Sequence, residues 1–113
     1  MDCIFCKIVA GEIPADILYQ GDEVIAFRDI NPLAPTHLLI IAKKHIPSLA
    51  QLSEAESSLI KDMVNTAIQL AKREGVAEGG YRLVVNCGKQ GGQLVPHLHM
   101  HLLGGRQLAD ALG

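Results

Sequence analysis

Three histidines, His97, His99 and His101, alternate with apolar residues near the end of the chain. If this segment is a β-strand, successive side chains point to opposite faces and the three imidazoles share one face. A neutral imidazole is nucleophilic near neutral pH, so it can attack phosphorus and form a covalent intermediate that water then releases. A solvated strand face is the ordinary alternative, but strict alternation of three histidines favours catalysis. The row is too long for all three rings to reach one metal ion at about 2.1 Å.

A loop rich in glycine and amide side chains comes shortly before these histidines. It runs from Asn86 to Gln93 and contains Gly88, Gly91 and Gly92. Glycine lets the backbone approach a ligand closely, and amide donors stabilise an anionic phosphoryl centre. The loop and the histidines together indicate phosphoryl or nucleotidyl chemistry.

Two cysteines near the start of the chain, Cys3 and Cys6, have an i, i+3 spacing. Such a pair can turn two thiolates toward one tetrahedral metal ion, and two reduced thiols in a helix are an equally good interpretation. A redox pair would follow a strand in a βαβ unit, which the pattern does not show. Cys87 shares a predicted strand face with Val85 and Leu83, so we expect it to be a buried apolar residue.

The elements that must position these residues are helices and strands in an irregular order. Apolar spacing predicts a short helix over residues 2–10 that stops at Gly11. A longer helix should start at a capping box formed by Ser53 and Glu56 and end at Gly75. These two helices are the helical part of the predicted fold.

Strand patterns occupy the remaining segments. They comprise a hairpin of residues 17–19 and 23–28, a buried run over 37–42, and final strands over 81–86 and 96–103. Hairpin and single strands around one long helix predict an α+β fold, with an antiparallel sheet of about five strands. We expect the long helix to cover one face of the sheet, and a second subunit or a ligand to cover the other.

Length and charge restrict the function classes. The chain has 113 residues and a formal net charge of −2, with lysine and arginine scattered. One domain over residues 1–113 is expected, and nothing in the charge pattern favours a nucleic-acid partner. No apolar run reaches the roughly 20 residues of a membrane span, and no signal-like segment opens the chain. These features predict a cytoplasmic protein with a small-molecule substrate.

The run from His97 to Leu103 resembles the His-φ-His-φ-His-φ-φ signature of the histidine triad (HIT) superfamily. Residues 104–107, Gly-Gly-Arg-Gln, are similar to the Hint-like branch, the nucleoside phosphoramidases. Segments 3–8, 27–32, 34–37 and 43–45 and the position of Asn86 match the same branch in order. The resemblance covers nearly the whole chain and implies a single HIT domain with a HIT-like fold.

The resemblance implies hydrolysis of the P–N bond in adenosine or other purine nucleoside 5′-phosphoramidates, with release of AMP. His99 would be the nucleophile that carries a covalent nucleotidyl intermediate, and His101 would contact the phosphate. His37 and His97 would belong to the hydrogen-bonded network that orients the catalytic site. Further substrate-binding residues implied by the resemblance are Asp29 at the ribose, Phe27 and Ile30 at the base, and Asn86, Gly92, Gln93 and Leu94 at the phosphate and leaving group.

One position departs from the family pattern. Relatives usually carry a hydroxyl residue where this chain has Leu94, and that hydroxyl is thought to assist the leaving amine. Leucine offers only its backbone N–H at this point. We therefore expect weaker catalysis toward poor amine leaving groups.

The resemblance also implies a structural zinc ion and a homodimer. Several members of the superfamily bind zinc through a cysteine pair and two histidines that match Cys3, Cys6, His45 and His97. Zinc at His97 would compete with a role of the same ring in proton transfer. No metal cofactor is required for the chemistry itself, since imidazoles and backbone donors can handle the charge.

Two other functions remain open from the sequence. One is a diadenosine polyphosphate hydrolase of the same superfamily, which would use the same nucleophile on a P–O–P bond. The other is a nucleotide-binding or partner-binding protein whose hydrolysis is incidental, an alternative that Leu94 keeps open.

Overall fold

A computed structural model describes residues 3–113. The elements in chain order are α1 (Ile4–Val9), β1 (Ile17–Gln20), β2 (Val24–Arg28), β3 (Thr36–Ala42), two 3-10 turns (Leu49–Gln51 and Glu54–Glu56), α2 (Ser57–Arg73), β4 (Tyr81–Val84) and β5 (His99–Gly104). The part of the predicted first helix at residue 2 lies outside the described residues. Within residues 3–113, no helix has the length and apolar character needed to cross a membrane.

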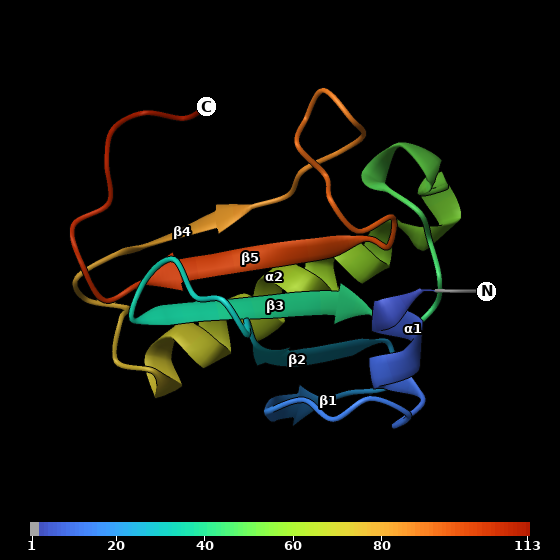
Figure 1. Cartoon of the computed structure of the whole chain (residues 1–113), viewed down its shortest axis with the longest axis horizontal. Coiled ribbons are helices and arrows are strands. Elements are labelled where there is room, and N and C mark those ends of the chain that lie inside the picture. Colours follow the sequence, from blue (N-terminus) through green and yellow to red (C-terminus); the bar gives the residue numbers. More distant parts are fainter. Residues whose placement is uncertain (1–2) are drawn as a thin grey trace.

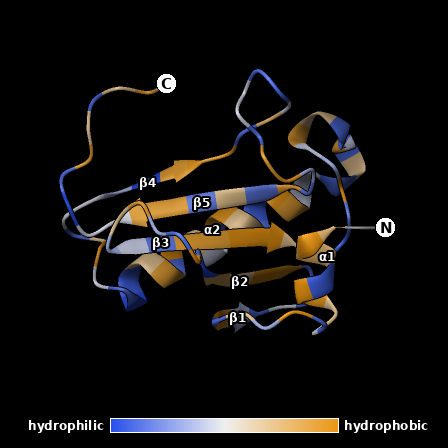
Figure 2. Ribbon diagram, viewed as in Figure 1, coloured by the Kyte–Doolittle hydropathy of each residue, from blue (hydrophilic) through white to orange (hydrophobic). Residues whose placement is uncertain are grey.

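The five strands form one antiparallel sheet in the order β1-β2-β3-β5-β4 (Figure 1). This confirms the predicted α+β architecture with one long and one short helix. β3 lies at the centre, and all seven of its residues are buried. Its apolar character is visible along most of its length (Figure 2). β3 pairs with β5 so that Ile41 faces His99 and Leu39 faces His101, which fixes where the histidines lie on the sheet.

The long helix α2 covers one face of the sheet. Met63, Ala67 and Leu70 pack in a core with alternate residues of the strands, including Leu38 and Met100, and with Leu98 just before β5. The helix is entered through a 3-10 turn whose capping box joins the residues expected, Ser53 and Glu56. It ends before Gly75, whose φ of 75° is left-handed and favours glycine.

The opposite face is partly covered by α1, which lies in front of the sheet in Figure 1, whereas α2 lies behind it. Phe5 and Ile8 pack there against Ile25, Phe27 and Ile41. The short helix therefore covers part of the face for which a second subunit or a ligand was expected. A six-residue helix was sufficient because each turn contributes a buried side chain.

The last strand is shorter than predicted, because it begins at His99 instead of Pro96. Pro96 has no N–H to donate, and the His97 N–H bonds to the Val95 carbonyl at 2.8 Å in a tight turn. β4 likewise ends at Val84, before residues 85–86. Cys87 is half-buried in the loop that follows, so the prediction of a fully buried strand residue was wrong.

Candidate active site

A cavity of about 250 Å³ opens on the α1 side of the sheet, beside β5. His99 and His101 project into it from one face of the strand, as their spacing predicted. The lining residues are Phe5, Asp29, Leu39, Asn86, Gly92, Leu94, Val95, His99 and His101. The cavity therefore joins two histidines, one carboxylate and the glycine loop, and its other walls are mainly apolar.

Backbone contacts fix the protonation of the His99 ring. Its Nδ1 lies 2.7 Å from the carbonyl oxygen of His97, and a carbonyl can only accept, so Nδ1 carries the proton. In the neutral ring the lone pair is then on Nε2. His99 is 6% exposed and lines the cavity, so its unprotonated nitrogen has the chemistry that a nucleophile at this cavity requires.

A second chain of hydrogen bonds fixes His37 and His101. The backbone N–H of Leu33 donates to His37 Nδ1 at 3.1 Å, which leaves the proton of the neutral ring on Nε2. That Nε2–H lies 2.9 Å from His101 Nδ1 and 3.4 Å from a carboxylate oxygen of Asp29. His101 Nδ1 therefore accepts, and its Nε2–H remains a donor for a ligand.

The surroundings keep these two rings neutral. Burial, followed by the neighbouring histidines His99 and His37, lowers the pKa of His101 to about 4. Burial also lowers the pKa of His37, although the Asp29 carboxylate opposes this effect. At neutral pH the pair thus provides uncharged, directional hydrogen bonds instead of two positive charges.

Side-chain amides hold the glycine loop in place. Asn86 Nδ2–H donates to the Gly91 carbonyl at 2.7 Å, and the Gly88 N–H donates to Gln93 Oε1 at 2.9 Å. Gln93 Nε2–H also bonds to the Pro47 carbonyl at 2.7 Å. The Gln93 side chain therefore clamps the loop and does not line the cavity, whereas Asn86 does.

Of the three remaining residues predicted to contact the substrate, one lines the cavity and two do not. Leu94 lines the cavity mouth and is 92% exposed. Phe27 is buried against Phe5, with ring centroids 5.7 Å apart, and Ile30 is 90% exposed; neither lines the cavity. Sequence reasoning missed Phe5, Leu39 and Val95 as lining residues, and only the position of Phe5 between the two cysteines gave any signal.

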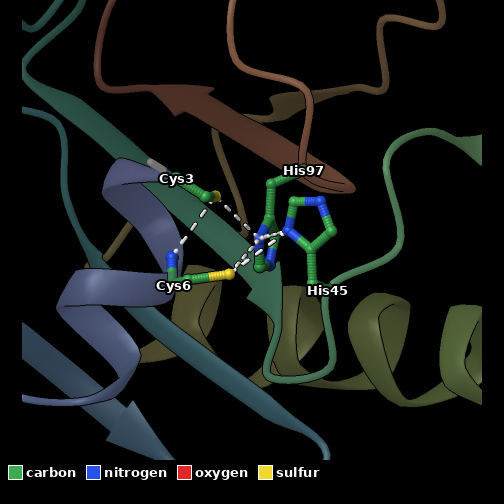
Figure 3. A group of neighbouring side chains, drawn as sticks. All are labelled: Cys3, Cys6, His45 and His97. Carbon is green, nitrogen blue, oxygen red and sulfur yellow. Dashed lines mark hydrogen bonds between the residues drawn. The ribbon is translucent and has the colours of Figure 1, made fainter. Parts of the chain in front are cut away.

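A second group of side chains lies next to the cavity and includes Cys3, Cys6, His45 and His97, which we call the Cys/His cluster (Figure 3). Their ligand atoms all lie within 4.8 Å of one another. Cys3 and Cys6 come from the start of α1, His45 from the loop after β3, and His97 from the turn before β5 (Figure 3). The structure thus brings together the four residues that the family resemblance implied.

The geometry of the Cys/His cluster fits a tetrahedral metal ion. His97 Nδ1 lies 3.3 Å from Cys3 Sγ, 3.6 Å from Cys6 Sγ and 3.2 Å from His45 Nδ1, and Cys6 Sγ lies 3.2 Å from His45 Nδ1. Ligand atoms of a tetrahedral zinc site lie about 3.3–3.8 Å apart. His97 Nε2–H donates to the Ala42 carbonyl at 2.5 Å, so the lone pair of Nδ1 faces the cysteines. Both ring nitrogens of His97 are therefore directed away from the cavity.

Comparisons with known proteins show which family the chain resembles. A model of the HIT domain matches residues 10–108. The chain is 50% identical to the purine nucleoside phosphoramidase of Escherichia coli K12 over 111 residues, which cover 98% of this chain and 93% of that protein.

Solved structures show the same relationship. A HIT family hydrolase from Legionella pneumophila superposes with a TM-score of 0.96 at 50% identity, covering 99% of this chain and 100% of that one. A histidine triad protein from Clostridium difficile has a TM-score of 0.96 at 44% identity, covering 99% and 97%.

The fold and the cavity define an α+β protein in which a buried imidazole lies beside a glycine-containing loop. The chain belongs to the HIT domain family.

Proposed function

We propose that this protein is a purine nucleoside phosphoramidase, which cleaves the P–N bond of adenosine 5′-phosphoramidates and releases AMP. The observation that carries the proposal is the tautomer of His99, whose Nδ1–H is held by the His97 carbonyl while Nε2 remains free at the cavity. The purine nucleoside phosphoramidase of Escherichia coli, at 50% identity over nearly the whole chain, supports the substrate class.

In the first step, His99 Nε2 attacks the α-phosphorus and the P–N bond breaks. The electron pair of that bond leaves with the amine, which takes a proton from water at the open side of the cavity next to Leu94. A nucleotidyl group is now bonded to Nε2. The negative charge on the phosphoryl oxygens is stabilised by the Nε2–H of His101 and by the loop of Asn86 and Gly92.

In the second step, water attacks the phosphorus of the nucleotidyl-His99 intermediate. The bond between phosphorus and Nε2 breaks, and the electron pair returns to the ring. One proton of the attacking water passes to solution, and AMP departs. Because His99 keeps its Nδ1–H on the His97 carbonyl throughout, the ring returns to its starting tautomer.

The rest of the substrate contacts follow from the positions of the side chains. Asp29 lines the cavity at the end of β2, where its carboxylate can accept from the ribose hydroxyls. The base would lie toward the exposed Ile30, with buried Phe27 supporting the wall through Phe5. Gln93 would support phosphate binding indirectly by holding the loop in place. The backbone N–H of Leu94 would donate a hydrogen bond to the phosphate.

We further propose that the Cys/His cluster holds a structural zinc ion. Two thiols and two imidazole nitrogens form a donor set typical of zinc, and their spacing fits a tetrahedron. Bound zinc would crosslink three chain segments. His97 would then orient the site through its backbone carbonyl, while its ring belongs to the metal.

The protein is proposed to act as a single HIT domain over residues 1–113, as a homodimer in the cytoplasm on a small purine nucleotide. The homodimer is proposed from the family resemblance. The three cysteines of the described chain are free thiols, which fits a reducing compartment.

Turnover of two substrates tests the function. The proposal predicts that adenosine 5′-phosphoramidate is hydrolysed with a kcat/KM well above that for diadenosine tetraphosphate, and that His99→Ala abolishes both. Faster cleavage of the dinucleotide would assign the chain to the other hydrolase class. AMP binding without hydrolysis of either substrate would make it a binding protein.

A further inference from the structure

His97 connects the Cys/His cluster directly to the nucleophile. Its ring Nδ1 faces the two cysteines and His45, and its ring Nε2–H donates to the Ala42 carbonyl. Its own backbone carbonyl accepts the Nδ1–H of His99 at 2.7 Å. His97 is fully buried, so the ring cannot rotate without displacing this carbonyl or its neighbours.

Phe5 makes a second connection between the same two sites. Phe5 belongs to α1, the helix that begins with the two cysteines. Its ring packs edge-on against the His97 ring, with centroids 5.8 Å apart, and against the His99 ring at 5.1 Å. Phe5 also lines the cavity, so a shift of α1 changes both the packing of the nucleophile and the wall beside it.

The local structure around these connections is weak without the Cys/His cluster. α1 has six residues, too few for a helix to be stable without tertiary anchors. The turn at Val95–Leu98 precedes β5. Its ties to the body are the Leu98 N–H on the Ile46 carbonyl, the Ala42 N–H on the Leu98 carbonyl, the Gln93 amide on the Val95 carbonyl and the His97 ring on the Ala42 carbonyl. The four cluster side chains join these segments to the loop after β3 (Figure 3).

We propose that His97 and Phe5 are positioning residues, which make the orientation of His99 depend on whether the Cys/His cluster holds its metal ion. The inference deepens the proposed function and rests on the nucleophilic role assigned to His99. The cluster would control the rate at a distance, since its ligand atoms face away from the cavity. Loss of the metal would remove the constraint on His97 Nδ1 and on the start of α1 together, and small shifts of both would let the His99 ring sample other tautomers and rotamers.

The effect on catalysis should appear in kcat. Outer contacts that orient a metal-ligating imidazole typically contribute about 10–100-fold to metal affinity or activity, and we expect a loss of the same order when the contacts that orient His99 change. Asp29 and Asn86 belong to other segments than α1 and the turn before β5, so their contacts to the substrate should change less than the orientation of His99. We therefore expect metal removal to lower kcat at least about tenfold, with a smaller change in KM because Phe5 also forms part of the cavity wall.

Nitrogen NMR of the histidine rings tests the inference without any substrate. In the zinc-loaded full-length protein, His99 should give one set of ring signals with the proton on Nδ1. After chelation, or in Cys6→Ser, the signals should shift toward a mixture of tautomers, and added zinc should restore them in the chelated wild type alone. Phe5→Leu should retain zinc and still show altered His99 signals with reduced kcat.

Two controls separate structural damage from positioning. Lys61→Ala changes an exposed side chain of α2, far from the cavity and the cluster, and should leave the His99 signals and kcat unchanged. Leu70→Ala destabilises the core on the other face of the sheet and should lower the melting temperature without altering the His99 tautomer. Unchanged His99 signals and kcat after metal removal would overturn the inference, even if the protein hydrolyses phosphoramidates. Altered signals in a protein without hydrolytic activity would support the coupling and reject the proposed function.

Discussion

The Nε2 atom of His37, on β3, lies 2.9 Å from the Nδ1 atom of His101, on β5. Because the Leu33 N–H occupies the other nitrogen of His37, the proton in this bond belongs to His37. The bond therefore turns the Nε2–H of His101 toward a ligand. Protonation of His101 on Nδ1 would remove the acceptor and break this arrangement, so the neutral state of the pair matters for both stability and catalysis.

The depressed pKa of His101 predicts a pH-dependent stability. Burial holds this pKa at about 4, below its ordinary value of 6.5. Between pH 4 and pH 6.5 the unfolded chain binds a proton that the folded chain does not. The contribution of His101 to the free energy of unfolding is therefore fully present above about pH 6.5 and is lost as the pH falls toward 4. For His101 alone the loss between about pH 7 and pH 5 should reach at most about 2 kcal/mol. Burial of His37 acts in the same direction.

Urea unfolding at both pH values, with a chelator present throughout, measures this loss. His101→Gln should show a smaller difference between the two pH values than the wild type. An equal difference in the two proteins would show that His101 keeps an ordinary pKa in the folded state.

Asp29 should act on binding of the ribose. Asp29→Asn removes the charge while keeping the size, and a hydrogen bond to a charged group contributes about 1.5–3 kcal/mol. We expect KM for adenosine 5′-phosphoramidate to rise about tenfold to a hundredfold with a smaller change in kcat. The matched control is the 2′,3′-dideoxy substrate, for which wild type and variant should have similar KM values. An equal rise for both substrates would place Asp29 elsewhere than at the ribose.

Much of this arrangement follows from local patterns in the sequence. Strand alternation correctly predicted that His99 and His101 share a face, while Leu98, Met100 and Leu102 enter the core on the α2 side. The capping box and the glycine after the long helix were also correctly predicted, because helix ends depend on nearby residues.

The separation of His97 from the other two histidines could not be predicted in this way. It depends on Pro96 leaving the strand ladder and on the Ile46 carbonyl, which accepts the Leu98 N–H from a distant part of the chain. Phe5 was missed for the same reason, since an apolar residue in a short helix does not reveal which rings it will contact. The role of Phe27 and Ile30 at the base was implied by the family resemblance. In the structure neither residue lines the cavity, because Phe27 is buried in the core and Ile30 is exposed.

Leu94 should limit the range of amines that can leave. Leu94→Ser places a hydroxyl at the cavity mouth, where it can donate a proton to the departing nitrogen. Turnover of substrates with poor amine leaving groups should increase, and stability should change by less than about 0.5 kcal/mol because the side chain is 92% exposed. Leu49→Ser, at an exposed leucine outside the cavity lining, is the control. The absence of any gain for Leu94→Ser would remove this explanation of leaving-group preference.

The Cys/His cluster should hold one zinc ion per chain. Elemental analysis of protein purified without an affinity tag should find zinc in the wild type and in Cys87→Ser, and little in Cys3→Ser. Chelation should lower the melting temperature of the first two proteins, since bound metal stabilises the folded state, and leave Cys3→Ser nearly unchanged. A wild type without zinc at neutral pH, or with zinc that survives Cys3→Ser, would contradict the site.

The central claim is that His99 carries the nucleotidyl group between two displacements at phosphorus. The stereochemical course of hydrolysis tests it most directly, using a P-chiral adenosine 5′-phosphoramidothioate in ¹⁸O-labelled water. Two successive in-line displacements, first by His99 Nε2 and then by water, predict a product with net retention of configuration at phosphorus. Net inversion would show a single direct attack by water and would contradict the covalent role of His99.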